Sequence, residues 1–236
     1  MPFPLLAIDI GNSRVKAAFF SKKGESTPIW LPSPAAVLEW KDYPIAYVDT
    51  RGETAWRQVL SQVNAEELNI SRKIPFNTAY TNRLGPDRIA QILAAWHVGE
   101  YPAVVISLGT ACVIDFIDER GHHQGGVITA GIGLRLRALL EGAAYLPQVE
   151  PALSPPLLGK DTTEAIQAGV INGLGFELQG WLRALAAPPA KIWVCGGESE
   201  YLRSYFPSDT IFVPDLTLRG VWLWWHFIHE GSFPSY

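Results

Sequence analysis

A strand–glycine turn–strand pattern occurs twice in the chain and constrains its fold more than any other sequence feature. Residues 8–15 read I-D-I-G-N-S-R-V and residues 106–113 read I-S-L-G-T-A-C-V, which share the isoleucine, an apolar third position, the glycine and the final valine. Each pattern runs on through further apolar residues to a basic residue followed by glycine, at 23–24 and 120–121. Either one supersecondary unit is duplicated, or common strand formers match by chance.

Helices and strands alternate around these two patterns, which favours an α/β fold. Helical spacing occurs at residues 33–40 and 54–69, with a short strand candidate at 44–49 between them. We expect two like halves, residues 1–102 and 103–236, with the boundary near Tyr101-Pro102. Two such halves would place their glycine turns across a cleft, where small ligands usually bind.

Charge and cysteine content exclude several classes of function. A formal net charge of −4 without a basic block favours a small soluble partner over nucleic acid or an anionic membrane. Cys112 and Cys195 each lie in an apolar run, so we expect buried thiols rather than a disulfide framework or a cysteine metal site. No basic residue precedes L-L-A-I, and Asp9 interrupts the apolar run. We therefore expect a cytoplasmic protein without an export signal.

The first glycine turn carries groups that suit a phosphate. Asp9, Gly11, Asn12 and Ser13 place one carboxylate and several backbone N–H groups between two strands. A phosphate bound through a cation requires these groups, whereas a plain hairpin turn does not.

A helix start at G-P-D-R, residues 85–88, allows two interpretations. Proline and aspartate are common in the first turn of a helix, where a negative charge is favoured. Alternatively, Asp87 accepts a proton from a substrate hydroxyl while Arg88 holds an anionic substrate group. Residues alone leave both open.

Other glycine-rich turns carry weaker signals. G-G-V-I-T-A-G at 125–131 leads into a helix whose buried side we expect to include the leucines at 134, 136, 139 and 140, and W-V-C-G-G at 193–197 suits a nucleotide lying against backbone. Asp161, Thr162 and Thr163 are candidate caps of a further helix. His122 and His123 are expected in an exposed turn, without a metal site. The aromatic run at 221–229 is expected in the core or at a subunit interface.

Taken in order, five motifs resemble the type III pantothenate kinases of the acetate and sugar kinase, Hsc70 and actin superfamily. They are D-x-G-N-S at 9–13, G-P-D-R at 85–88, L-G-T-A at 108–111, G-G-V-I-T-A-G at 125–131 and D-T-T-E-A-I-Q-A-G at 161–169. The resemblance spans nearly the whole chain. It implies two RNase H-like halves and ATP-dependent phosphorylation of pantothenate to 4′-phosphopantothenate, the first step of coenzyme A biosynthesis.

The resemblance also implies roles for individual residues. Asp87 corresponds to the proton acceptor and Gly85, Pro86, Asp87 and Arg88 to the pantothenate-binding loop, with Thr162 and Tyr80 in the same pocket. The implied ATP contacts are Asp9, Ile10, Gly11, Asn12, Ser13, Arg14, Val15, Lys16 and Thr110. Mg²⁺ would accompany ATP, with Asp9 near the metal-bound phosphates, and the family suggests a homodimer.

Two positions depart from the family pattern. Ser107 stands where the family usually has an aspartate that binds a monovalent cation, so a K⁺ or NH₄⁺ site there loses its charge, and Asp115 and Asp118 are the nearest acidic residues. Ala130 replaces a proline, which changes loop stiffness more than chemistry. The alternatives are a related nucleotide-binding regulatory protein without kinase activity and a kinase of another small polyol.

Overall fold

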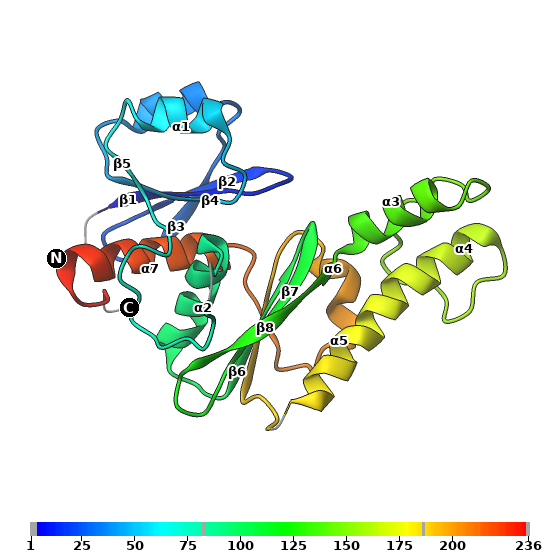
Figure 1. The fold of residues 1–236 in the computed structure, drawn as a ribbon. Coiled ribbons are helices and arrows are strands. Elements are labelled where there is room, and N and C mark those ends of the chain that lie inside the picture. Colours follow the sequence, from blue (N-terminus) through cyan, green and yellow to red (C-terminus); the bar gives the residue numbers. More distant parts are fainter. Residues whose placement is uncertain (1–3, 82–83, 186, 235–236) are drawn as a thin grey trace. The chain divides into compact units, whose positions relative to one another are not determined.

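The computed structural model describes residues 4–81, 84–185 and 187–234, and its backbone forms two compact units. Unit 1 comprises residues 1–99 and 215–236, and unit 2 comprises residues 100–214. Each unit contains one five-stranded sheet, whose elements are labelled in Figure 1.

The two sheets have the same topology. Unit 1 arranges β1 (Leu5–Ile10), β2 (Val15–Phe20), β3 (Ser26–Ile29), β4 (Ile45–Asp49) and β5 (Ala65–Glu67) in the order β3-β2-β1-β4-β5. Unit 2 contains β6 (Ala103–Leu108), β7 (Ala111–Ile117), β8 (His123–Ala130), β9 (Lys191–Cys195) and β10 (Ile211–Phe212), in the order β10-β9-β6-β7-β8. In each unit the first three strands form antiparallel pairs. The fourth strand pairs in parallel with the first, and the fifth pairs in parallel with the fourth. This shared order confirms the predicted α/β fold and supports duplication over coincidence.

Helices cover both faces of the sheet in unit 1. The 3₁₀ helix η1 (Pro34–Trp40) and α1 (Thr54–Leu60) pack over Leu6, Ile8 and Ile10 of β1. The other face is covered by α7 (Leu216–Glu230) and α2 (Pro86–Val98), which contact β1 and β4 and each other. The two helices approach so closely that a Cβ at Gly220 would lie 1.8 Å from the carbonyl oxygen of Ala90.

The last helix, α7, belongs to a different unit than the expected division of the chain gave it. The sequence division placed all residues after 102 in the second half, whereas α7 packs within unit 1. Trp222, Trp224 and Trp225 are buried there, and the Trp222 ring stacks on Phe20 of β2. The aromatic run is therefore core, as one of the two expectations had it, because α7 supplies the apolar cover for β1 and β2.

The helix expected at residues 54–69 is shorter than its pattern indicated. It ends at Leu60, and residues 65–67 form β5, which pairs in parallel with β4. One stretch of apolar spacing thus contains both a short helix and a short edge strand. Periodicity alone does not distinguish these two structures in short segments.

The helices of unit 2 are α3 (Ile132–Gly142), α4 (Thr162–Gln167), the π-helical turn η2 (Ala168–Asn172), α5 (Gly173–Ala184), α6 (Ser199–Leu202) and the 3₁₀ turn η3 (Arg203–Tyr205). The α4–η2–α5 run packs on Val104, Ile106 and Leu108 of β6. The expectation that α3 buries its leucines is wrong for Leu139 and Leu140, which are 37% and 39% exposed. Only the start of α3 reaches the core, and its later turns extend away from the sheet (Figure 1).

His123 was expected in an exposed turn, and this is wrong. It is the first residue of β8, is fully buried, and its Nε2 lies 2.8 Å from Oδ1 of Asp115 on β7. Strand pairing of β7 with β8 turns its side chain inward beside this carboxylate, which the local sequence does not reveal. In the part of the chain that the structure describes, no helix has the length and apolarity that a membrane crossing requires.

Candidate functional site

The first glycine turn follows β1 and is closed by a hydrogen bond from the N–H of Gly11 to the carbonyl oxygen of Arg14, 3.2 Å long. Since side chains alternate along a strand and Ile8 and Ile10 face η1 and α1, Asp9 faces the opposite side of the sheet, which α2 and α7 cover. Asp9 lies directly across the hairpin from Lys16 of β2. The turn thus presents a carboxylate on the side of the sheet where α2 begins.

Burial dominates the electrostatics of Asp9. The residue is 9% exposed, and desolvation raises its pKa to about 6, against the opposing effect of Lys16 and with a smaller contribution from the negative charge of Asp87. A buried carboxylate held at this cost has its charge compensated when a cation binds. The charge of Asp87 therefore acts on Asp9, and both residues belong to unit 1.

Asp87 lies in the first turn of α2, after Gly85 and Pro86. Its carboxylate folds back over Gly85, where a Cβ would stand 2.6 Å from Asp87 Oδ1. Glycine at this position therefore leaves room for the carboxylate. Asp87 as a whole is half-buried.

Arg88 and Tyr80 lie together beside this helix start. Arg88 is 5% exposed, and its guanidinium carbon Cζ stands 4.8 Å from the centre of the Tyr80 ring. A guanidinium over an aromatic ring is stabilised by the ring quadrupole and keeps its in-plane N–H groups for other partners. The stretch from Tyr80 to Gly85 includes residues 82 and 83, which lie outside the described residues.

Three glycine-containing turns meet in unit 2. The turn after β6 holds Gly109 and Thr110, and the N–H of Gly131, after β8, donates to the carbonyl oxygen of Thr110 over 3.1 Å. A Cβ at Gly131 would lie 1.9 Å from the carbonyl oxygen of Gly109, and one at Gly196, after β9, would lie 2.0 Å from that of Leu108. Gly131 and Gly196 are therefore required for close backbone packing.

Glu198 ties these turns together and was not singled out from the sequence. Its Oε2 and Oε1 accept hydrogen bonds from the N–H groups of Ile132 and Gly133, at 2.8 and 3.0 Å, while its own N–H donates to Leu108. The signal was an acidic residue directly after the Gly196-Gly197 turn. Its partner, the start of α3, lies 65 residues away in sequence and could not be identified from it.

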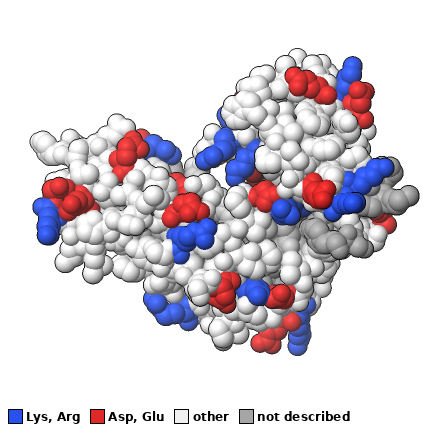
Figure 2. Space-filling view, turned by 180° about the vertical axis from the view of Figure 1, so that it is seen from behind, with Lys and Arg blue, Asp and Glu red and all other residues white. Residues whose placement is uncertain are grey.

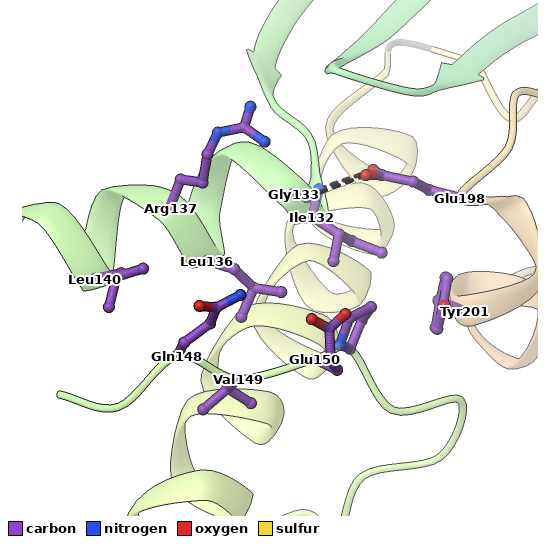
Figure 3. A pocket seen from close by; sticks show the side chains of 11 residues that line it. Ile132, Gly133, Leu136, Arg137, Leu140, Gln148, Val149, Glu150, Glu198 and Tyr201 are labelled. Atoms are coloured by element: carbon purple, nitrogen blue, oxygen red, sulfur yellow. Dashed lines mark hydrogen bonds between the residues drawn. The ribbon is translucent and has the colours of Figure 1, made fainter. Parts of the chain in front are cut away.

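A pocket with a volume of about 320 Å³ opens beside Glu198 (Figure 3). Its walls are the first turns of α3, the segment 148–151, and Tyr201 of α6. Glu150 and Glu198 both lie on it. The pocket therefore combines an apolar wall with two carboxylates.

Thr162 is the first residue of α4 and belongs to unit 2, whereas Asp9 and Asp87 belong to unit 1. It lines a second hollow together with Leu139, Lys160 and Asp161. Oδ1 of Asp161 accepts the N–H of Glu164 at 2.8 Å, so the capping interpretation of Asp161 is confirmed.

Ser107 lies on β6, opposite Val113 and Cys195, and both nearby acidic residues are engaged. Asp115 is buried against His123, whereas Asp118 accepts hydrogen bonds from Arg120, His122 and Gln124 in its own turn. Against the opposing effect of desolvation, these last hydrogen bonds lower the pKa of Asp118, which is half-buried. Among the described residues there is no group of three or more His, Cys, Asp or Glu side chains that could hold a metal ion.

Comparisons with a family model and with individual proteins point to the same family. The model of the family described as type III pantothenate kinase matches residues 35–184. The type III pantothenate kinase of Phocaeicola vulgatus is 34% identical over 231 residues, covering 92% of this chain and 95% of that protein. The type III pantothenate kinase of Gloeobacter violaceus is 32% identical over 237 residues, covering 92% and 96%.

Solved structures share the fold. A conserved putative Baf family transcriptional activator from Campylobacter jejuni superposes with a TM-score of 0.62 and 25% identity, covering 96% of this chain and 98% of that one. The ethanolamine utilization protein EutJ from Carboxydothermus hydrogenoformans has a TM-score of 0.56 at 13% identity, covering 95% and 90%. The archaeal actin homolog Ta0583 has a TM-score of 0.50 at 11% identity, covering 97% and 100%. The last two show the fold alone, an actin-like one.

Proposed function

The chain belongs to the type III pantothenate kinase family, and from this premise we propose that it transfers the γ-phosphoryl group of ATP to the primary hydroxyl of pantothenate. The product is 4′-phosphopantothenate, and the reaction is the first step of coenzyme A biosynthesis. One observation within the site carries the chemistry. A buried Asp9 carboxylate precedes a glycine turn, and the charge of a second carboxylate, Asp87 at a helix start, acts on it.

Residues 9–16 and Thr110 contact ATP in this proposal. The N–H groups of a glycine turn and the charge of Lys16 offset the negative charge of the phosphates. Mg²⁺ suits the Asp9 side chain, because this ion is usually held by one or two carboxylates together with phosphate oxygens. When bound, it neutralises charge on the transferring phosphoryl group.

Asp87 acts on the acceptor alcohol. Its carboxylate aligns the pantothenate hydroxyl and takes its proton while the hydroxyl oxygen bonds to the γ-phosphorus, and the bond to the bridging oxygen breaks to release ADP. Arg88, held over the Tyr80 ring, binds the carboxylate of pantothenate. Gly85, Pro86 and Thr162 complete the pantothenate contacts in this proposal.

A direct assay tests the proposed function. The purified protein is incubated with ATP, Mg²⁺ and pantothenate, and 4′-phosphopantothenate is measured by mass spectrometry. Product that appears only when all three are present supports the proposal. ATP turnover that ignores pantothenate, or transfer to a different polyol in a panel of small alcohols, contradicts it.

Gly109 provides a prediction specific to ATP. A Cβ at Gly109 would have no atom of the described residues within 4 Å, so the protein itself does not require glycine there. We expect Gly109→Val to raise the KM for ATP about tenfold or more, because the side chain blocks close approach of a phosphate. The KM for pantothenate and the melting temperature should change little.

Gly180→Ala is the matched control, since the added Cβ would also meet open space and Gly180 lies within the helix α5, not in a glycine turn. Steady-state kinetics of both variants measure the two KM values, and thermal unfolding measures their melting temperatures. An equal rise of both KM values, or unfolding of Gly109→Val, would assign the glycine to structure only.

Monovalent cations should have little effect on activity. A carboxylate would offset the free-energy cost of removing water from a cation, whereas Ser107 offers only the dipole of one hydroxyl group. The nearest acidic residues, Asp115 and Asp118, already interact with other groups. We expect rates in sodium, potassium and ammonium buffers of equal ionic strength to agree within about threefold. Strong potassium activation that survives Asp115→Asn and Asp118→Asn would place a cation site elsewhere.

The proposal includes a homodimer. Exposed apolar side chains concentrate on α3 and the segment after it, including Leu140, Tyr145 at 100% exposure, Leu157 and Leu158. Such a concentration is typical of an interface, and a second copy of the chain covers it in this proposal. Light scattering should then give the mass of a dimer, not of a monomer.

Location and partners complete the proposal. The buried thiols Cys112 and Cys195 fit a reducing compartment, and the enzyme is proposed to act in the cytoplasm. Acidic and basic side chains are interspersed on the face drawn in Figure 2, which fits small substrates better than nucleic acid or an anionic membrane.

A further inference from the structure

A buried hydrogen bond joins the helix that carries Asp87 to the last helix of the chain. The side-chain Nε2 of Gln91 on α2 donates to Oγ1 of Thr217 on α7 over 3.0 Å. Both residues are buried, at 5% and 6% exposure. Both helices belong to unit 1, where they lie against each other (Figure 1). Neither residue is among those assigned above to ATP or pantothenate, so the mechanism leaves this polar pair without a role.

A close backbone contact lies beside this hydrogen bond. Gly220 is three residues after Thr217 and therefore lies on the same face of α7. A Cβ at Gly220 would meet the carbonyl oxygen of Ala90, the residue before Gln91, at 1.8 Å. The missing Cβ allows the helix backbones to approach closely, and the hydrogen bond adds a directional constraint that apolar packing lacks. The two contacts together fix the distance of α2 from α7 and the rotation of α2 about its own axis.

The rotation of α2 determines where the side chains of its first turn point. Asp87 stands four residues and Arg88 three residues before Gln91. Side chains at these spacings are neighbours on one face of a helix. Phosphoryl transfer depends on precise alignment, and a displacement of about 1 Å at the reacting groups can lower the rate up to ~100-fold. A small rotation of α2 would therefore move both side chains away from their places on pantothenate.

We infer that Thr217 is a positioning residue for pantothenate phosphorylation, which acts through Gln91 to hold the first turn of α2 in the orientation that brings Asp87 to the acceptor hydroxyl. This inference rests on the proposed function. The ATP contacts of that proposal are residues 9–16 and Thr110, none of which belongs to α2. Loss of the hydrogen bond should therefore impair the use of pantothenate and leave the KM for ATP unchanged.

The test compares two substitutions of Thr217 that differ in the hydroxyl group. Thr217→Val replaces the hydroxyl by a methyl group and should lower kcat/KM for pantothenate about tenfold, with an unchanged KM for ATP. Thr217→Ser keeps the hydroxyl and should retain the kcat/KM of the unaltered protein. All rates are measured below the melting temperature of the least stable variant. Normal kcat/KM in folded Thr217→Val would overturn the inference.

A double variant separates positioning from stability. Gln91→Met combined with Thr217→Val removes both polar partners and leaves an apolar contact, an exchange that can be nearly neutral for folding. Its melting temperature should therefore exceed that of Thr217→Val alone, while kcat/KM for pantothenate stays about tenfold below that of the unaltered protein. If the hydrogen bond served only stability, activity would recover together with the melting temperature, and the inference would be wrong.

Trp222→Phe is the matched control on α7. The Trp222 ring stacks on Phe20 of β2 with 5.4 Å between ring centres, so the smaller ring weakens the packing of α7 at its contact with β2. This variant should have a lower melting temperature and the kcat/KM for pantothenate of the unaltered protein. An equal loss of activity here would overturn the specific role of Thr217, while the kinase activity itself would stand. Absence of product from the unaltered protein would instead refute the proposed function, and this inference with it.

Discussion

Replacing Asp87 with asparagine is expected to lower kcat at least ~100-fold while the protein stays folded. Asparagine keeps the shape of the side chain, fits over Gly85 as the carboxylate does, and is tolerated at a helix start. It cannot take a proton from the alcohol of pantothenate. The measurement is kcat for pantothenate phosphorylation, together with the melting temperature and the affinity for ATP.

Asp215→Asn is the matched control for a purely helical role. Asp215 precedes α7 in the same unit and pairs with Arg219 at 3.0 Å, so it is an acidic residue at a helix start without proposed chemistry. Its loss should cost roughly 1 kcal/mol of stability at most and leave kcat near that of the unaltered protein. Near-normal turnover in folded Asp87→Asn would return Asp87 to the same helical role.

Local patterns were sufficient for the hairpins and their turns. Apolar runs around Gly11 and Gly109 predicted two strand pairs, and the structure confirms both as β1–β2 and β6–β7. The basic–glycine pairs also mark real turns, since Gly24 and Gly121 have φ of 79° and 76°, which glycine adopts without strain. Such features depend on neighbours in sequence and are therefore visible in it.

Contacts between distant segments were not predictable in the same way. α7 joins unit 1 because its tryptophans fit against Phe20 and against α2, a choice that depends on shape rather than on periodicity. His123 is buried because Asp115 stands beside it on the next strand, although its own neighbours in sequence are polar. The start of α3 is held by hydrogen bonds to Glu198. The sequence motif at 125–131 leads into this helix but does not reveal its distant partner Glu198.

The surroundings of the predicted site residues were likewise predictable from the sequence only in part. The sequence named Asp9 and Asp87 separately, and the structure adds that the charge of Asp87 helps to raise the pKa of Asp9. The structure also adds the contact between Arg88 and Tyr80, which stand on either side of the undescribed residues 82 and 83 in the sequence. Only a folded chain reveals the electrostatic cost at Asp9, because that cost arises from burial.

Asp9→Asn is expected to abolish most activity and yet to stabilise the protein at neutral pH. The neutral amide cannot hold a cation beside the phosphates, so kcat/KM should fall at least ~100-fold. Stability should change in the opposite sense, because desolvation raises the pKa of Asp9 from its ordinary 3.8 to about 6. The folded protein therefore carries a penalty for the charged form that the unfolded chain lacks.

The pH dependence of this stabilisation follows from the sign of the shift. Below the ordinary pKa the carboxyl is protonated in both states, and the penalty is absent. As pH rises through the window from 3.8 to about 6, the folded protein releases its proton less readily than the unfolded chain, and stability is lost. Above this window the loss is complete, about 3 kcal/mol from a shift of this size.

Asp49→Asn supplies the contrast needed to interpret the measurement. Asp49 is buried at the end of β4, but its carboxylate accepts hydrogen bonds from the backbone N–H groups of Arg51 and Gly52 and from Arg57. Its replacement should destabilise the protein at neutral pH, since these donors lose a charged acceptor. Unfolding by denaturant at pH 4 and pH 8 measures both effects, and Asp9→Asn should gain relative to the unaltered protein only at the higher pH. A gain of equal size at both values would mean that packing, not the buried charge of Asp9, limits stability at the first glycine turn.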